Sequence, residues 1–278
     1  MLSAAYIPKL FLRYNAAMPS SDRNFDDLID RFSQNIYGNV RGQVRLEVLW
    51  THLLEQLPQI QSGIESGKPL RVLDAGAGMG QISTRLIELG HEVFLNDLSE
   101  NMITRARAEV SQLNCRIPAQ FHHGPVQSLS VDEIGQFDLV MFHAVLEWLA
   151  EPQDTLLHLL KFVKPGGHLS LMFYNRDALI FRNLVRGNWR KVESGVLRGD
   201  EGGLTPYHPL GPEEVEAWLT DQRMTIVARA GVRVIYDYME RALRESRPIE
   251  EIVRLEWQYA QKEPYLHMGR YIHLFARA

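Results

Sequence analysis

Glycines and two aspartates mark the part of this sequence that could do chemistry. Asp74 is followed by glycines at positions 76, 78 and 80, between a short apolar run and a helical pattern. Glycines there permit positive φ and let a ligand approach the backbone, while the start of the helix offers unpaired N–H groups. Asp97 ends the next apolar run, seventeen residues beyond Gly80. A carboxylate in that place can accept both hydroxyls of a ribose, so the pattern predicts a nucleoside cofactor.

The glycine spacing separates the classes of cofactor. A dinucleotide-binding loop has the form G-x-G-x-x-G, but Gln81 stands where its third glycine would be. The chain instead has D-x-G-x-G-x-G, an acidic end to the second strand, a fourth strand over 137–143, and Lys164-Pro-Gly-Gly before a fifth. In this order, the four features resemble the class I S-adenosylmethionine-dependent methyltransferases. The sequence therefore favours S-adenosylmethionine and disfavours NAD or FAD.

Short apolar runs that alternate with helical patterns must position these residues. We expect strands over 70–74, 92–97, 119–123, 137–143 and 169–173, separated by helices over 80–89, 99–113 and 156–163. This alternation predicts an α/β fold with a doubly wound, mostly parallel, Rossmann-like sheet. The flanking patterns predict helices over 25–32, 44–57, 176–198, 212–219 and 239–261, and strands over 224–234 and 271–276. The sheet thus gains N-terminal helices and an α-helical insertion before the last strands.

Composition and charge narrow the class of protein. The 278 residues are 45% hydrophobic and 23% charged, and the net charge of −4 argues against binding nucleic acid mainly by overall charge. A single cysteine, Cys115, cannot form an internal disulfide, and no apolar run approaches the ~18–20 residues that span a bilayer. We expect a cytoplasmic protein. Residues 1–21 are predicted to be a disordered extension, and 22–278 a single methyltransferase domain with a core at 70–175 and a substrate-side insertion at about 176–222.

Segments outside the cofactor core carry a more specific resemblance. These are Asp22-Arg-Asn-Phe-Asp-Asp, Asn35-Ile-Tyr-Gly, Phe142-His-Ala-Val-Leu-Glu-Trp148, Leu171-Met-Phe-Tyr-Asn175, Gly231-Val-Arg-Val, Glu263-Pro-Tyr-Leu and Gly269-Arg-Tyr-Ile-His273. They resemble the bacterial tRNA 5-carboxymethoxyuridine methyltransferases, a family that esterifies the carboxylate of the wobble uridine. The resemblance runs from Asp22 to the C-terminus. It implies a tRNA substrate that binds through its anticodon region.

The resemblance also implies a set of cofactor-binding residues. Arg45 would meet the methionine carboxylate, and Asp97 the ribose. With the glycine loop and the end of the second strand, the expected S-adenosylmethionine site comprises Arg45, Asp74, Gly76, Ala77, Gly78, Asp97, Leu98, Gln127, Ser128 and His143. We expect no metal.

The implied reaction suits a site without a general base. A carboxylate with an ordinary pKa near ~4 is already ionised at neutral pH. Burying it unpaired would be costly, so a clamp of cations or hydroxyls is expected. The candidates for this clamp are Tyr37, Tyr174, Arg233, Arg270 and Tyr271. His143 is interpreted as a turn histidine that donates to the cofactor or backbone, and Glu147 as a helix-cap or pocket residue.

The densest basic stretch follows the fifth strand. Arg182, Arg186, Arg190 and Lys191 lie three to four residues apart or adjacent, so one helix would present them on one side, facing RNA phosphates. Two acids in the segment Leu197-Arg-Gly-Asp-Glu-Gly-Gly weaken the RNA interpretation of the following loop. Three alternatives stay open: a small-molecule carboxyl or hydroxyl methyltransferase, a non-catalytic protein that binds S-adenosylmethionine or RNA, and a nicotinamide oxidoreductase.

Overall fold

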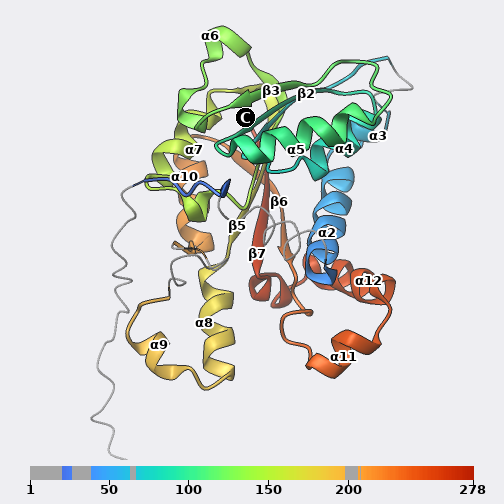
Figure 1. Cartoon of the computed structure of the whole chain (residues 1–278). Coiled ribbons are helices and arrows are strands. Elements are labelled where there is room, and N and C mark those ends of the chain that lie inside the picture. Colours follow the sequence, from blue (N-terminus) through green and yellow to red (C-terminus); the bar gives the residue numbers. More distant parts are fainter. Residues whose placement is uncertain (1–20, 27–38, 63–66, 198–205, 207) are drawn as a thin grey trace, which may run out of the picture.

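Seven strands form one sheet in the order β3-β2-β1-β4-β5-β7-β6 (Figure 1). The computed structural model describes residues 21–26, 39–62, 67–197, 206 and 208–278. The strands are β1 (Arg71–Ala75), β2 (Glu92–Asp97), β3 (Gln120–His123), β4 (Phe137–His143), β5 (Val163–Tyr174), β6 (Thr225–Val232) and β7 (Tyr271–Arg277). β1 to β5 pair in parallel, whereas β7 runs antiparallel to both β5 and β6. The predicted doubly wound α/β fold is confirmed.

The helices lie on both faces of this sheet. They are α2 (Val40–Gln56), α3 (Gln59–Ser62), α4 (Gln81–Glu88), α5 (Glu100–Ser111), α6 (Val131–Ile134), α7 (Pro152–Leu160), α8 (Arg176–Val185), α9 (Trp189–Glu193), α10 (Pro212–Asp221), α11 (Arg241–Ser246) and α12 (Ile249–Ala260). Short 3₁₀ helices are η3 (Val126–Ser128), η4 (Leu146–Trp148) and η5 (Tyr265–Met268).

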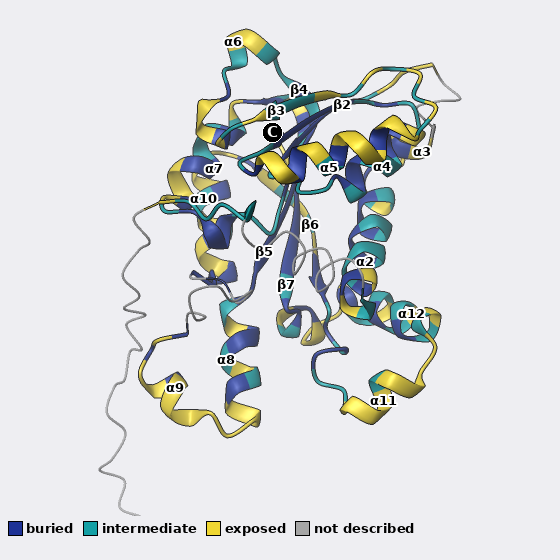
Figure 2. Ribbon diagram, viewed as in Figure 1, coloured by how far each residue is buried: buried dark blue, intermediate teal, exposed yellow. Residues whose placement is uncertain are grey.

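Two hydrophobic clusters hold these layers to the sheet. On one face, α2, α4, α5 and α12 bury apolar side chains such as Val48, Leu86 and Ile252. On the other face, α7 and α10 contribute Leu156 and Leu219. The central strands are therefore buried on both sides, as Figure 2 shows for β4, β5 and β7, which explains their nearly continuous apolar sequence.

The strand order reverses next to β1, and this reversal locates the functional edge of the sheet. β2 and β4 flank β1, so the loops after β1 and β4 diverge toward opposite faces and leave a crevice outside the carboxyl ends of the strands. Because β7 is antiparallel to β5, its first residues lie at the edge where β5 ends, with Tyr271 opposite Tyr174. Val232 at the end of β6 also lies opposite Tyr271. The carboxyl ends of β1, β4, β5 and β6 and the start of β7 therefore meet along one edge of the sheet.

Element boundaries agree with prediction where local signals are strong. Ser99 caps α5 as predicted, and its hydroxyl accepts a hydrogen bond from the Met102 N–H. Asn39 caps α2 in the same way through the Gly42 N–H, so this helix begins four residues before the predicted start. The bounds predicted for the helix over 156–163 were wrong. This helix, α7, begins at Pro152, and Val163 already belongs to β5.

One prediction about the insertion was wrong. The stretch 176–198 is not a single helix, because α8 ends at Val185 and α9 begins at Trp189. Gly187 has φ +74°, a left-handed conformation that a helix cannot contain. Arg182 therefore lies on α8, Arg186 caps that helix, and Arg190 and Lys191 lie on α9. The four basic residues do not share one side of a helix.

Some predicted segments lie outside the described residues. These are all but Ser21 of the expected extension and most of the helix expected over 25–32. No helix within the described ranges is long and apolar enough to cross a membrane.

Candidate active site

The loop after β1 has the close backbone approach that its glycines predict. Gly76, Gly78 and Gly80 all have φ between +56° and +77°. A Cβ at Gly76 would lie 2.4 Å from a methyl group of Val145, in the loop after β4. Any larger residue would separate the loops after β1 and β4, so glycine at this position lets the two loops pack together at the bottom of the crevice. Gly80 leads into α4, whose first N–H groups point toward the loop.

Asp97 stands at the carboxyl end of β2 against this loop. One carboxylate oxygen accepts from the Gly78 N–H at 2.7 Å, and the other accepts from the Ser99 N–H at 2.9 Å. Burial raises the pKa of Asp97, while these two backbone hydrogen bonds oppose that rise. The carboxylate is thus fixed in orientation by the backbone, and it lines a pocket at the sheet edge.

Asp74 lies beneath the same loop. Its side chain is buried and accepts from the Ser83 hydroxyl at 2.7 Å. Burial raises its pKa to about 7, and the nearby charge of Asp97 adds to the rise. Asp74 therefore fastens α4 to β1 behind the glycine loop, in addition to lining the pocket.

The pocket gathers nine of the ten predicted cofactor-binding residues. It is lined by Arg45, Asp74, Gly76, Ala77, Gly78, Asp97, Leu98, Gln127 and His143. Ser128 is not among the lining residues, because its hydroxyl turns away and donates to the Pro125 carbonyl at 2.7 Å. The family resemblance implied Ser128 together with Gln127. In η3 the two side chains leave in different directions.

Sequence reasoning gave no role in the pocket to residues 22–25. The Arg23 N–H donates to the Trp148 carbonyl at 3.0 Å, and Asp22 accepts from the Ala150 N–H at 2.8 Å. The Phe25 ring meets the Trp148 ring edge-on, with 4.9 Å between centroids. Asp22, Arg23, Phe25 and Trp148 all line the pocket. Phe25 and Trp148 form an apolar wall of the pocket, and the motif beginning at Asp22 was the signal that could have located it.

His143 lies at the end of β4 and begins a chain of buried hydrogen bonds. Its Nε2 is 2.6 Å from the Ser170 Oγ, which is 2.7 Å from the His273 Nε2. The His273 Nδ1 lies 2.7 Å from the His52 Nδ1 on α2. Burial lowers the pKa of His143 to about 3 and that of His52 to about 4, and it lowers that of His273 well below its usual range. These imidazoles are neutral at physiological pH, and His143 is held by a side chain rather than by backbone.

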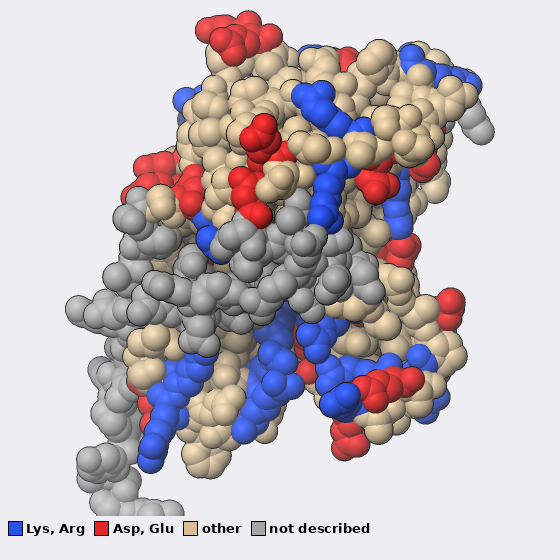
Figure 3. All heavy atoms as spheres, viewed as in Figure 1, with Lys and Arg blue, Asp and Glu red and all other residues tan. Residues whose placement is uncertain are grey.

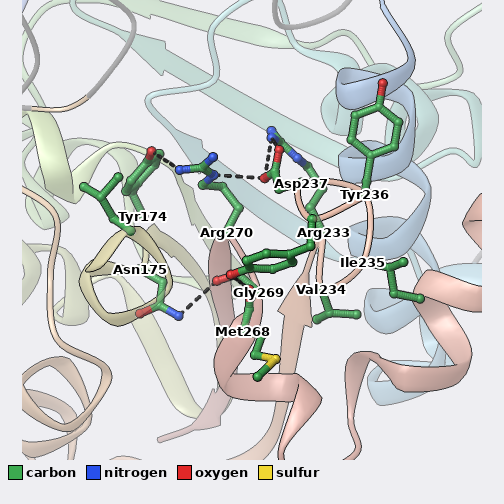
Figure 4. Close-up of polar contacts among 12 residues, drawn as sticks. Tyr174, Asn175, Arg233, Val234, Ile235, Tyr236, Asp237, Met268, Gly269 and Arg270 are labelled. Atoms are coloured by element: carbon green, nitrogen blue, oxygen red, sulfur yellow. Dashed lines mark hydrogen bonds and ion pairs between the residues drawn. The ribbon is translucent and has the colours of Figure 1, made fainter. Parts of the chain in front are cut away.

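A second cluster, of charged side chains, lies at the ends of β5, β6 and β7 (Figure 4). The Arg270 guanidinium donates to the Tyr174 hydroxyl at 2.6 Å and, through Nε, to Asp237 at 2.9 Å. Arg233 donates to both oxygens of Asp237, at 2.5 and 2.6 Å. The side chains of Arg270 and Asp237 are only 6% and 4% exposed. We call Tyr174, Arg233, Asp237 and Arg270 the cationic cluster.

The cationic cluster holds more positive than negative charge. Burial alone would raise the pKa of Asp237, but Arg233 and Arg270 hold it well below its usual range. Burial, together with the nearby charge of Arg270, lowers the pKa of Arg182 on α8 to about 10. Within the described residues, the Nε atoms of Arg182 and Arg233 are buried without a hydrogen-bond partner. Three arginines thus face one carboxylate.

Tyr271 connects the cationic cluster to the pocket. Its ring centroid is 5.7 Å from the guanidinium carbon of Arg45, which lines the pocket, and 6.0 Å from that of Arg233. The Tyr174 ring packs against it edge-on at 5.4 Å. Arg233 has φ +64°, a left-handed conformation that costs a non-glycine residue on the order of 1–3 kcal/mol and is often found at functional sites. The structure thus brings four predicted clamp residues together: Tyr174, Arg233, Arg270 and Tyr271.

Tyr37, the fifth predicted clamp residue, lies outside the described residues. Sequence reasoning missed Asp237, which binds both arginines, because nothing in its local pattern distinguishes it from a surface acid.

Glu147 in η4 is 1% exposed, and one of its carboxyl oxygens has no partner in the described part of the chain. Burial raises the pKa of Glu147 to about 8, so it is mainly the protonated acid at neutral pH. It does not line the pocket. Among the described residues, no group of three or more histidine, cysteine or acidic side chains could hold a metal ion.

Comparisons with known proteins agree with this geometry. Residues 73–171 match the family model of a methyltransferase domain. Among solved structures, magnesium protoporphyrin IX methyltransferase from Synechocystis PCC 6803, with S-adenosylhomocysteine bound, superposes with a TM-score of 0.59 at 17% identity, covering 91% of this chain and 95% of that one. The fold and the site define an S-adenosylmethionine-dependent methyltransferase.

Sequence relatives narrow this class. The chain is 40% identical over 256 residues to the tRNA 5-carboxymethoxyuridine methyltransferase of Escherichia coli K12, covering 92% of this chain and 96% of that protein. The ubiquinone biosynthesis O-methyltransferase of Bordetella avium is 30% identical over 163 residues, or 58% of this chain and 65% of that protein. The chain belongs to the family of tRNA 5-carboxymethoxyuridine methyltransferases, which confirms the expected resemblance.

Proposed function

We propose that this protein methylates the carboxylate of 5-carboxymethoxyuridine at the wobble position of tRNA, giving the methyl ester. The observation that carries the proposal is the buried excess of arginines, which is connected to the pocket-lining residue Arg45 through the ring of Tyr271. A site for a neutral acceptor would gain nothing from that charge. A site for a carboxylate needs it to offset the cost of removing the anion from water.

The residues at the pocket suit S-adenosylmethionine. Asp97 is oriented by two backbone N–H groups and would accept the ribose hydroxyls. Arg45 would bind the methionine carboxylate, and the glycine loop leaves room for the cofactor against the backbone. When bound, S-adenosylmethionine supplies an electrophilic methyl group, whose bond to sulfur breaks as a carboxylate oxygen attacks.

The cationic cluster would hold the substrate carboxylate. Arg270 and Arg233 are already oriented by Asp237, so little side-chain order remains to be gained on binding. Hydrogen bonds that involve an ionised group are worth about 1.5–3 kcal/mol each. The Tyr174 hydroxyl, with its pKa raised by burial, stays a neutral donor. Tyr271 would form the wall between the two ligands.

No proton has to leave the substrate, so the site needs no general base. His143 is neutral and is tied to Ser170, and it would orient the cofactor rather than take a proton. The contribution of the protein is then alignment and exclusion of water. Ideal alignment is worth on the order of 7–11 kcal/mol of the barrier. The apolar wall of Phe25 and Trp148 serves the exclusion of water.

The tRNA would approach along the substrate-side insertion. Arg186, Arg190 and Lys191 are exposed and would contact phosphates. Arg182 is predicted to join them, but because it is partly buried near Arg270 we propose that it supports the cationic cluster instead. Because its substrate would be tRNA, we expect the enzyme to act in the cytoplasm.

Mass spectrometry of tRNA nucleosides tests the proposal. Purified protein with S-adenosylmethionine should convert 5-carboxymethoxyuridine in tRNA to its methyl ester, and unmodified tRNA should accept no methyl group. Arg270→Gln should abolish most of this conversion. Methylation of small carboxylic acids without any ester on tRNA would overturn the proposal and favour a small-molecule methyltransferase.

A further inference from the structure

The helices α8 and α9 expose apolar side chains that a protein surface normally covers. Trp189 and Val185 are each 61% exposed, and Phe181 is 38% exposed. Leu184 on the same helix is also exposed. Single exposed apolar residues are common, but a contiguous group that includes two aromatic rings marks an interaction site. We call Phe181, Leu184, Val185 and Trp189, with their basic neighbours Arg186, Arg190 and Lys191, the α8–α9 surface.

Charge indicates what kind of partner this surface fits. Between residues 176 and 197 the chain has five basic and two acidic residues, although the whole protein carries a net charge of −4. Figure 3 shows lysine and arginine side chains gathered at the lower end of the molecule, over α8, α9 and α11, while α6 at the opposite end is acidic. Aromatic faces between cations are the combination that binds single-stranded nucleic acid.

The tryptophan is held in place rather than mobile. Its indole Nε1–H donates to the Leu184 carbonyl at 3.0 Å, which ties the ring to the end of α8. The turn between the helices is fixed by Asn188, whose side chain donates to Asn183 at 3.1 Å and whose N–H donates to the Asn183 carbonyl at 2.9 Å. A ring fixed before binding loses little freedom when a base stacks on it.

The α8–α9 surface is also rigidly joined to the cationic cluster. Asn175 follows Tyr174, caps α8, and donates to the carbonyls of His267 and Gly269 at 2.9 and 3.0 Å. Phe181 packs against Tyr238, next to Asp237, with 5.6 Å between ring centroids. With a rise of about 1.5 Å per residue, the ten residues of α8 span about 15 Å, the length of a few nucleotides. A base stacked on Trp189 would thus lie a few nucleotides from the reacting one.

We propose that Trp189 is a stacking platform for an unpaired anticodon-loop base near the wobble position, and that Arg186 and Arg190 bind the phosphates beside it. This inference rests on the proposed function, since it takes tRNA as the substrate. A loop is the part of tRNA that fits, because its bases can turn their faces outward, whereas paired bases in a duplex cannot.

Kinetics with tRNA containing 5-carboxymethoxyuridine test the platform. Trp189→Ala should raise the KM for tRNA about tenfold, because base stacking on an aromatic ring is lost. Trp189→Phe should restore much of the affinity. In both variants kcat and the affinity for S-adenosylmethionine should match those of the wild type. The control Val227→Ala removes an apolar side chain from β6 that is 52% exposed, and it should change none of these quantities.

The salt dependence separates the platform from its cationic neighbours. Trp189→Ala should leave the slope of log affinity against log salt unchanged, whereas Arg186→Glu with Arg190→Glu should flatten it by about 0.7–0.9 per lost phosphate contact.

Wild-type KM in Trp189→Ala, with tRNA still methylated, would overturn the inference and leave the proposed function standing. Dimers that Trp189→Ala dissolves would also overturn it, since the surface would then bind a second copy. A wild-type protein that methylates no tRNA would instead overturn the proposed function.

Discussion

The cofactor pocket and the cationic cluster are neighbours built in opposite ways. The pocket depends on backbone: the Gly78 and Ser99 N–H groups fix Asp97, and glycine φ angles shape the loop. The cationic cluster depends on side chains, with Arg233 and Arg270 meeting on Asp237. The glycine loop and Asp97 lie close together in the chain, with Gly78 and Asp97 19 positions apart, whereas the cluster joins Tyr174 and Arg270, which are 96 positions apart. The part of the pocket that we propose for the cofactor is thus a local motif, and the cluster that we propose for the substrate carboxylate is a long-range assembly.

Arg270→Met is expected to give the largest difference between the effect on activity toward tRNA and the effect on cofactor affinity. The substitution removes two charge-assisted hydrogen bonds worth about 1.5–3 kcal/mol each, so kcat/KM for tRNA should fall at least about 100-fold. Calorimetric affinity for S-adenosylmethionine should stay within about twofold of the wild type. The matched control is Arg229→Met, which removes an exposed arginine that binds Glu216 and should leave both quantities unchanged. An equal loss of cofactor affinity in Arg270→Met would mean that the two regions are not separable.

The converse experiment is Asp97→Ala. Loss of a charged acceptor of ribose hydroxyls should weaken S-adenosylmethionine binding at least about tenfold in calorimetry. The Kd for tRNA, measured without cofactor, should not change. Asp132→Ala, on the exposed helix α6, is the control. An unchanged cofactor affinity in Asp97→Ala would remove this residue from the site.

The same contrast explains what the sequence could predict. The glycine loop, Asp97 and the parallel strands follow from short-range patterns, because one turn and one strand end determine the conformation of each. Ser128, expected in the cofactor site, is not among the residues that line the pocket, because adjacent side chains in this 3₁₀ turn point in different directions. Asp237 was missed because only the antiparallel pairing of β7 with β5 and β6 brings Arg270 to it. The prediction of a single helix over 176–198 did not take account of Gly187, whose left-handed conformation separates α8 from α9.

A third test concerns the histidine chain behind the pocket. Burial lowers the pKa of His52 to about 4. Between about pH 6.5 and 4, His52 is therefore protonated in the unfolded chain but stays neutral in the folded chain. Stability from this group is therefore complete above pH 6.5 and falls as the pH falls, by about 2 kcal/mol at pH 5.

Urea unfolding of the wild type and His52→Phe at pH 7.5 and 5 measures this contribution. The free energy of unfolding of the wild type, relative to the variant, should drop by about 2 kcal/mol on going to pH 5. Asp74 and Glu147 titrate in the opposite sense, since burial raises the pKa of each carboxyl, but they do so in both proteins and cancel. A difference that is the same at both pH values would show that His52 carries no such penalty.

The smallest effect is expected in the pH dependence of the chemical step. Burial holds the pKa of His143 near 3, so the imidazole does not titrate between pH 6 and 8, and the substrate carboxylate is ionised throughout. The kcat, measured with both substrates saturating, should change less than about twofold over this range. A rising limb with an apparent pKa near 6.5 that disappears in His143→Asn would make His143 a base and favour a hydroxyl acceptor.

The surplus of positive charge in the cationic cluster has a consequence for turnover. In the proposed reaction the carboxymethoxy group of the wobble base carries one negative charge and its methyl ester carries none, so methyl transfer would remove the attraction between this group and the cationic cluster. Arg233 and Arg270 would keep their bonds to Asp237 when the ester leaves, so the Asp237 carboxylate stays paired. The same asymmetry should make the finished tRNA a weak competitor of the unfinished one. The enzyme could then select unmethylated molecules from a largely methylated pool by charge alone.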